Sequence, residues 1–286
     1  MKFVKPDASV FIPDGLAVGE AFRRITHLGI GAHQDDLEIM AFHGIEACFN
    51  NRDRWFGGVT CTNGGGSPRT GEYASYTDEA MAALRRREQE KAAIVGNYGA
   101  LVQLNYASAE IKDAATGRLK SDLVQILREA RPEVVYTHNP ADKHDTHLAV
   151  VFTALAALRE LPAAERPKTV YGCEVWRGLD WMDDGDKVPL DVGRRETLSM
   201  ALIGVYDSQV EGGKRYDLAT MGRRRANASY FQSHATDEAG ELWFAMDLTP
   251  LVSDESADVE DFVLAHVDKF RASVAEKIKK YWIEKR

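Results

Sequence analysis

A histidine and three carboxylates occupy six consecutive positions in the stretch "GIGAHQDDLEIM", from His33 to Glu38. Like charges repel at this spacing, and none of these side chains adds apolar contact. The stretch follows a run typical of a buried strand, so the polar residues come where a strand ends. His33 and Asp36 are three residues apart where a loop becomes a helix, which brings both to one side. This crowding predicts a site that holds a cation.

A second polar cluster, "THNPADKHDTH" (137–147), follows another predicted strand. His144 and His147 are again three residues apart, in what should be the first turn of the next helix. In open α/β sheets, ligands bind outside the carboxyl ends of the strands. Two helix starts at neighbouring strand ends can therefore aim His33, Asp36 and one histidine of this cluster at a single point.

Two imidazoles and one carboxylate, with an open fourth position, form the ligand set of a catalytic zinc. A structural zinc would need four ligands, usually with cysteines, and no cysteine lies near these clusters. A metal would neutralise the crowded carboxylates. It would leave Asp35 free beside the water that the metal activates, where a general base must lie. The alternative is that Asp35 and Asp36 cap a helix and that the histidines lie on the surface. That alternative requires all four residues to have come together by chance at the ends of two strands.

Strand and helix patterns alternate along the first two thirds of the chain, which favours an α/β fold with a parallel sheet and helices on both faces. The predicted strands are 24–33, 54–63, 100–106, 133–139 and 168–176. After residue 176 the pattern loosens into helices, a strand over 242–248 and a final helix over about 258–283. We expect a single domain over 1–286, with a core over about 24–176 and a C-terminal α+β extension or cap over about 177–286.

Composition excludes several classes of function. The chain has 286 residues, 44% hydrophobic and 28% charged, which is ordinary for a globular protein. A net charge of -8 without a broad basic stripe argues against a nucleic-acid or anionic-membrane partner. The N-terminus lacks the apolar segment of a signal peptide, and apolar runs stay short of the ~18 residues that span a bilayer. Three scattered cysteines fit a reducing compartment, so we expect a cytoplasmic protein.

These motifs carry a resemblance to a known family. "AHQDDLE" is similar to the AHPDDE signature of the PIG-L/LmbE-like deacetylases, and "DKHDTH" is similar to their second motif, HPDH. "YDSQ" (206–209) resembles their later HxSQ element, and Arg85 with Glu88 fits their R-x-x-E helix. The resemblance covers about residues 24–235, with the motifs in the family's order.

The resemblance implies a Rossmann-like fold, with a three-layer αβα arrangement, and a zinc-dependent hydrolase that removes the acetyl group from N-acetylated amino sugars. It implies that His33, Asp36 and His147 bind zinc or another divalent metal. Asp35 would be the general base, and His144, when protonated, would stabilise the oxyanion. The implied partner is a small-molecule N-acetyl amino sugar conjugate. Relatives often form oligomers, so a homo-oligomer is also expected.

The sequence departs from the family pattern at three places. Gln34 replaces a proline that supplies backbone shape. Asp145 and Thr146 replace Pro-Asp, so the carboxylate that supports a metal ligand is predicted to be lost or displaced by one residue. Ser108 and Ala109 stand where relatives often carry an Asp-Gly that meets the sugar. This last change bears on the identity of the sugar more than on the chemistry.

Three further residues are candidates for substrate binding: Arg69, which could reach sugar hydroxyls or an anionic group, together with Arg85 and Ser108. We expect His138 to be an ordinary residue at a strand end and Trp176 to pack in the core.

Two other functions remain open from the sequence. One is a non-haem iron oxygenase, because "HQD" matches the H-x-D of those enzymes. The βαβ alternation argues against their all-β jelly roll. The other is a sugar-binding protein that keeps the metal and has lost turnover.

Overall fold

The computed structural model describes residues 1–282. Residues 283–286, with which the predicted domain ends, lie outside the described residues. Within the described residues an eight-stranded sheet has the order β1-β4-β3-β2-β5-β6-β8-β7. The strands are β1 (Ser9–Phe11), β2 (Ile25–Gly31), β3 (Trp55–Thr62), β4 (Ala100–Tyr106), β5 (Val134–His138), β6 (Thr169–Cys173), β7 (Val188–Asp191) and β8 (Leu242–Asp247).

The centre of this sheet is parallel. The run β4-β3-β2-β5-β6 pairs in parallel, whereas β1 joins β4, and β8 joins both β6 and β7, in the antiparallel sense. The chain adds β3 and β4 on one side of β2 and then β5 and β6 on the other. The carboxyl ends of β2 and β5 are therefore the point where the winding reverses, and ligands bind at such a point in open α/β sheets.

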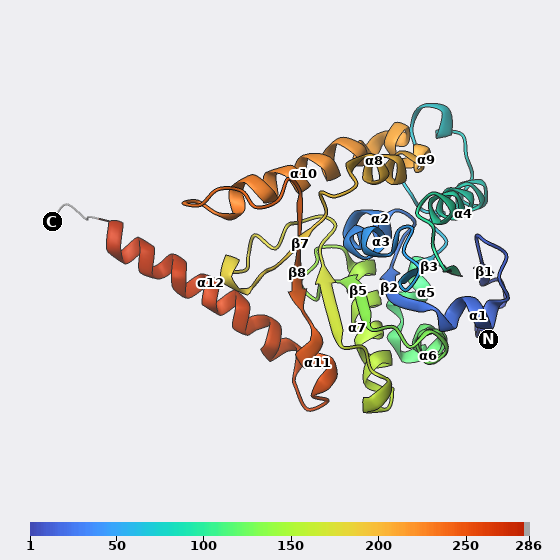
Figure 1. The fold of residues 1–286 in the computed structure, drawn as a ribbon, viewed down its shortest axis with the longest axis horizontal. Helices are drawn as coiled ribbons and strands as arrows, with labels where there is room; N and C mark the ends of the chain where they lie inside the picture. Colours follow the sequence, from blue (N-terminus) through green and yellow to red (C-terminus); the bar gives the residue numbers. More distant parts are fainter. Residues whose placement is uncertain (283–286) are drawn as a thin grey trace.

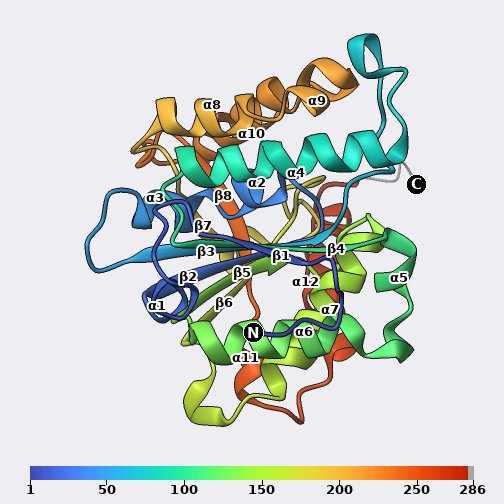
Figure 2. The same ribbon diagram turned by 90° about the vertical axis from the view of Figure 1, so that its right-hand side faces the viewer.

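Helices cover both faces of the sheet, so the predicted three-layer α/β arrangement is confirmed (Figure 2). In both views α4, α8 and α10 lie on one face and α6, α7 and α11 on the other (Figures 1 and 2). The longer helices are α4 (Asp78–Val95), α6 (Arg118–Ala130), α7 (Asp145–Arg159), α8 (Glu196–Gly204), α10 (Tyr216–Phe231) and α12 (Val259–Tyr281). The shorter ones are α1 (Val18–Arg23), α2 (Asp36–Met40), α3 (Phe42–Cys48), α5 (Ser108–Lys112), α9 (Asp207–Gln209) and α11 (Thr249–Ser253).

Apolar side chains of the described residues form a separate core on each face of the sheet. One cluster joins Ile30 and Val59 to the inner sides of α6 and α7. The other joins Leu37 and Phe56 to α4 and α8. Complete burial of side chains of this size stabilises the fold by roughly 1.5–3 kcal/mol each.

The glycines of β2 allow α2 to lie directly on the strand end. A Cβ at Gly29 would come within 2.9 Å of Leu37 Cδ2, and one at Gly31 within 3.1 Å of Asp36 Cβ. Larger side chains at these positions would push α2 away from the sheet. This close approach fixes where Asp36, the first residue of α2, lies relative to the end of β2.

Some elements differ from the prediction. The apolar residues of 37–50 recur at helical spacing, which predicts one helix, but the structure has two, α2 and α3, which meet at Ala41. The sequence pattern did not predict β1, β7 or α5, because each is short. β1 and β7 are ordered by pairing with β4 and β8. Helix α12 projects from the body (Figure 1), and residue 283, the last of its predicted range, lies outside the described residues. None of the described helices combines the length and apolarity needed to cross a bilayer.

Candidate metal and catalytic site

The β2 loop, residues 32–36, turns sharply between β2 and α2. Asp35 has φ 94°, in the left-handed region that few non-glycine residues adopt. Asp36 Oδ2 accepts a hydrogen bond from the His33 backbone N–H at 2.7 Å. The turn therefore folds the Asp36 side chain back toward His33, as the i, i+3 spacing predicted.

The β5 loop, residues 139–144, is shaped by its own polar side chains. Asp142 Oδ1 accepts from the His144 N–H at 2.9 Å, and Asn139 Oδ1 accepts from the Ala141 N–H at 2.8 Å. The other carboxylate oxygen, Asp142 Oδ2, lies 3.0 Å from His147 Nδ1. Because Nδ1 donates to this carboxylate, Nε2 of His147 is the nitrogen that faces the β2 loop.

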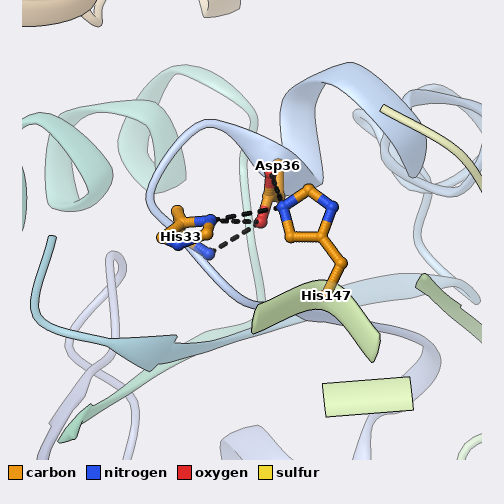
Figure 3. A group of neighbouring side chains, drawn as sticks. All are labelled: His33, Asp36 and His147. Atoms are coloured by element: carbon orange, nitrogen blue, oxygen red, sulfur yellow. Dashed lines mark hydrogen bonds and ion pairs between the residues drawn. The ribbon is translucent and has the colours of Figure 1, made fainter. Parts of the chain in front are cut away.

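His33, Asp36 and His147 converge on one point at the switch in the sheet (Figure 3). His33 Nδ1 lies 3.3 Å from His147 Nε2 and 3.4 Å from Asp36 Oδ2. The third separation, from His147 Nε2 to Asp36 Oδ1, is 3.6 Å. Ligand atoms ~2.0–2.1 Å from a tetrahedral zinc lie about 3.3–3.4 Å apart. The donor atoms and their spacing therefore fit a divalent metal.

The protonation of Asp36 also suits a metal ligand. Burial alone would raise the pKa of this carboxyl, but the nearby rings of His147 and His138 hold it well below its ordinary value. Burial lowers the pKa of His33, so its ring is neutral and offers a lone pair. The cluster thus combines an ionised carboxylate with an imidazole that is ready to coordinate.

His138, the last residue of β5, lies beneath the cluster and belongs to it. Its ring is fully buried and stacks on that of His147, with centroids 3.8 Å apart. Nε2 of His138 accepts from the Ala32 N–H at 2.9 Å and lies 3.3 Å from Asp36 Oδ2. Burial lowers the pKa of His138 to about 4, so the ring is neutral at pH 7. The expectation that His138 is an ordinary strand-end residue was wrong.

Asp35 faces the cavity from the other side of the β2 loop and pairs with Arg85 of α4. Arg85 Nη2 lies 2.8 Å from Asp35 Oδ2, and both side chains are buried. Arg85 also donates to the Gln34 carbonyl and to Ser67 Oγ. Burial raises the pKa of Asp35 to about 8, while Arg85 lowers it and Asp36 raises it. A carboxyl with a pKa in this range can exchange a proton near neutral pH.

His144 caps the start of α7 and overlies the cluster. Its Nδ1 accepts from the Thr146 N–H at 3.3 Å, and its ring stacks on His147 with centroids 4.6 Å apart. Burial lowers the pKa of His144 to about 4. Because Nδ1 accepts, the neutral ring carries its proton on Nε2 and can donate a hydrogen bond without being charged. A neutral His144 could therefore stabilise an oxyanion, without the protonation that the sequence analysis expected.

A cavity of about 470 Å³ opens above these residues. Arg85 and Ser108 line it as predicted for substrate-side residues, and Trp176, expected in the core, lines it too. Arg69 is not among the lining residues. Its guanidinium instead donates to the Gly65 carbonyl and pairs with Asp78, which holds its own loop together.

Asp142 was also missed. The carboxylate that supports His147 was expected near Asp145 or lost, but it comes from five residues before His147. Asp145 is exposed at the start of α7, where the helix turns its side chain to solvent. A turn in which the Asp142 N–H bonds the Asn139 carbonyl at 3.0 Å brings Asp142 back beneath the histidine. The "NPAD" turn residues before the motif were the available signal.

The fold and site define a doubly wound α/β protein with a two-histidine, one-carboxylate cluster at its switch point. Residues 28–158 match the family described as PIG-L: GlcNAc-PI de-N-acetylase. This match confirms, over that segment, the resemblance seen in the sequence. An Escherichia coli (strain K12) relative, described as the uncharacterized deacetylase YaiS, is 28% identical over 151 residues. That alignment covers 52% of this chain and 76% of the relative.

Solved structures share the fold at low identity. The N,N'-diacetylchitobiose deacetylase from Pyrococcus horikoshii has a TM-score of 0.61 and 19% identity, covering 82% of this chain and 88% of that one. GalB, the 4-carboxy-2-hydroxymuconate hydratase from Pseudomonas putida KT2440, has a TM-score of 0.59 and 16% identity, covering 78% and 96%. These similarities establish the Rossmann-like architecture. They also show that proteins of this fold carry out more than one reaction.

Proposed function

We propose that the protein is a metal-dependent hydrolase that removes the acetyl group from an N-acetylated amino sugar or its conjugate. The observation that carries this proposal is the convergence of His33, Asp36 and His147 beside the Asp35–Arg85 pair in one cavity. The family match over residues 28–158 supports it, as does the deacetylase description of the Escherichia coli relative.

His33, Asp36 and His147 would hold the metal, zinc in the first instance. When bound, it would supply Lewis-acid activation of a water and of the amide carbonyl. Asp142 would fix the His147 ring through the Nδ1 hydrogen bond. His138 would hold the end of the β2 loop through the Ala32 N–H.

Asp35 would move the proton in this reaction. It accepts a proton from the attacking water as the carbon–oxygen bond forms, and it passes that proton to the nitrogen as the carbon–nitrogen bond breaks. Acetate and the free amine are released. Arg85 keeps the Asp35 carboxylate directed into the cavity. His144 Nε2–H would donate to the developing oxyanion, a contact typically worth ~10²–10³ in rate.

The remaining expectations stay proposals. The whole chain would act as a single domain in the cytoplasm and would self-associate. The α/β sheet is not the jelly roll on which the iron-oxygenase alternative depends. The sugar-binding alternative is decided by experiment.

The test is a panel of N-acetylated amino sugars and their conjugates, with released acetate and free amine measured separately. We expect both products in equal amounts from wild-type protein, loss of release after chelation, and recovery on adding zinc. His147→Ala serves as the paired control and should lack bound metal by elemental analysis. Binding of metal and sugar without release of acetate would overturn the proposal and favour the sugar-binding alternative.

A further inference from the structure

Helix α12 stands away from the rest of the protein (Figure 1). Val259 and Phe262, in its first turn, pack against the core formed with α6 and α7, and Lys269 Nζ lies 2.6 Å from Asp186 Oδ2. None of the 23 residues of α12 is buried. A helix of this length spans roughly 34 Å, and most of its stability normally comes from packing of one face. Within residues 1–282 the second half of α12 has no such packing, because nearly every residue in it is exposed.

Apolar side chains nevertheless line one face of α12 along its length. This α12 stripe consists of Val263, Val267, Phe270, Val274, Ile278 and Tyr281. Successive members are three or four residues apart, which places them on one side of a helix. Their exposed fraction rises toward the end of the helix, from 38% at Phe270 to 57% at Ile278 and 70% at Tyr281. A continuous exposed apolar surface of this kind marks an interaction site.

Charge is divided along the same helix. Residues 259–268 contain three acidic residues and no lysine or arginine, whereas residues 269–281 contain five lysines and arginines and one glutamate. In the part of the chain that the structure describes, two ion pairs involve α12, Lys269–Asp186 and Arg271–Asp268, and both lie near its middle. This polarity complements the helix dipole, but it also leaves an acidic start and a basic end without ion-pair partners. It therefore decides how a second helix can lie alongside.

We propose that α12 packs antiparallel against α12 of a second copy of this chain, about a two-fold axis near the middle of the helix. The acidic start of each helix then lies beside the basic end of the other, whereas a parallel pair would place like charges side by side. The α12 stripe has the same symmetry. Val263 falls opposite Ile278 of the other copy, and Val267 falls opposite Val274. A two-fold contact buries the same surface on both copies, so one stripe is sufficient to form it.

This pairing is independent of the deacetylase proposal, because α12 contributes no residue to the catalytic cavity. It gives the expected self-association a specific surface. Burial of the stripe supplies the attraction, as at the seam of a coiled coil, and the opposed charges set the direction of the two helices.

The first test is the mass of the full chain in solution, measured by sedimentation equilibrium over a range of concentrations. Wild type should have at least twice the mass of one chain. Val274→Glu/Ile278→Glu should halve the wild-type mass, because it places charge within the stripe. Leu264→Glu is the matched control on the same helix. Leu264 is also exposed but lies beside the stripe, so this variant should keep the wild-type mass.

Both substituted positions of the double variant are exposed in the single chain, so its fold should persist, and circular dichroism checks this. A wild-type protein that stays monomeric, or a mass that the double variant leaves unchanged, would overturn the inference. A monomer that instead binds phosphatidylglycerol vesicles through α12 would assign the stripe to a lipid surface and also overturn it.

The second test determines the direction of the pair by disulfide cross-linking. The three native cysteines are buried, so cysteines introduced on α12 are the accessible thiols. Val263→Cys/Ile278→Cys should form a covalent dimer under mild oxidation, because the two positions face each other across an antiparallel pair. Either single variant should stay uncross-linked, since its two thiols lie about 22 Å apart along the pair and a disulfide needs Cα atoms within ~7 Å. Efficient cross-linking of a single variant would show a parallel pair and overturn the antiparallel arrangement.

The third test addresses the opposed charges. Lys279→Glu/Lys280→Glu should weaken pairing about tenfold at low salt, and the difference from wild type should shrink as salt rises. Lys91→Glu/Lys168→Glu is the control, because it changes the net charge equally at exposed positions outside α12 and should pair like wild type. Tighter pairing in Lys279→Glu/Lys280→Glu would mean that the basic ends lie together, which contradicts the antiparallel arrangement.

Discussion

The β2 loop supplies the metal-binding candidates His33 and Asp36, and the β5 loop supports the third, His147 of α7, but the two loops are organised in opposite ways. In the β2 loop, Asp35 is held from outside, by Arg85 of α4. In the β5 loop, Asp142 comes from the loop itself and holds His147. The position of Asp35 in the β2 loop thus depends on how α4 packs against that loop. The orientation of His147 depends on the turns of the β5 loop itself.

This difference separates two tasks. The external support reaches Asp35, which we propose to move a proton, whereas the internal support reaches His147, which we propose to bind metal. A proton carrier needs a tuned pKa, which a cation on a neighbouring helix can adjust. A metal ligand needs a fixed ring orientation, which one short hydrogen bond supplies. Changes in the two loops should therefore fail in different ways.

The largest effect is expected from Asp35→Asn. Asn cannot accept the proton of the attacking water, so kcat should fall by ~10²–10⁴. Because Asp35 is not among the converging ligand atoms, bound metal measured by elemental analysis should stay at the wild-type level. Asp36→Asn is the control from the same loop and should lose metal as well as turnover. Full activity in Asp35→Asn would refute its assignment as the base.

The matching change in the β5 loop is Asp142→Asn, which should act on the metal. Loss of the negative charge beside His147 Nδ1 should weaken metal affinity by ~10–100-fold, as measured by competition with a chelator. Asp145→Asn is the paired control, since this exposed carboxylate stands where the family motif would place the support. If Asp145→Asn weakens metal binding and Asp142→Asn does not, the support has been assigned to the wrong residue.

The sequence was informative where the chemistry is local. The parallel sheet was predicted because strand and helix patterns alternate along the chain, and His33 and Asp36 because one short turn joins them. Asp142 and His138 were not predicted, because their positions depend on how the β5 loop folds back under α7. Arg69 was misassigned, because nothing in its neighbours indicates that its guanidinium closes its own loop.

Edge strands were missed for a related reason. β1 and β7 are short and take their conformation from the strands beside them, so neither has a pattern of its own.

Arg85→Gln tests whether the external support sets the pKa of Asp35. Arg85 lowers this pKa, so its removal should raise it further and move the acidic limb of the kcat/KM profile to higher pH. Because the ionised carboxylate is the base, kcat/KM at a pH below the limb should fall about tenfold for each pH unit that the limb moves, and it should recover at higher pH. Arg85→Lys should restore most of the limb, and Arg86→Gln, which removes a more exposed arginine of α4, should leave it in place. An unmoved limb in Arg85→Gln would show that Arg85 does not tune Asp35.

The smallest effect is expected at Gln34, where the β2 loop departs from the family pattern. Its Nε2 donates to the Thr62 carbonyl at 3.0 Å, while its buried Oε1 has no partner among the described residues. One bond gained beside one unsatisfied atom leaves a small net stabilisation, so Gln34→Ala should lower the free energy of unfolding by only ~1 kcal/mol in denaturant titrations. Gln103→Ala is a matched control, because Gln103 is also buried, donates to the Arg86 carbonyl at 3.1 Å and leaves its Oε1 unpaired among the described residues. The two variants should lose similar stability and keep kcat within a few-fold of wild type. A much larger loss of kcat at Gln34 alone would mean that the β2 loop depends on this side chain to position Asp35, and not on Arg85 alone.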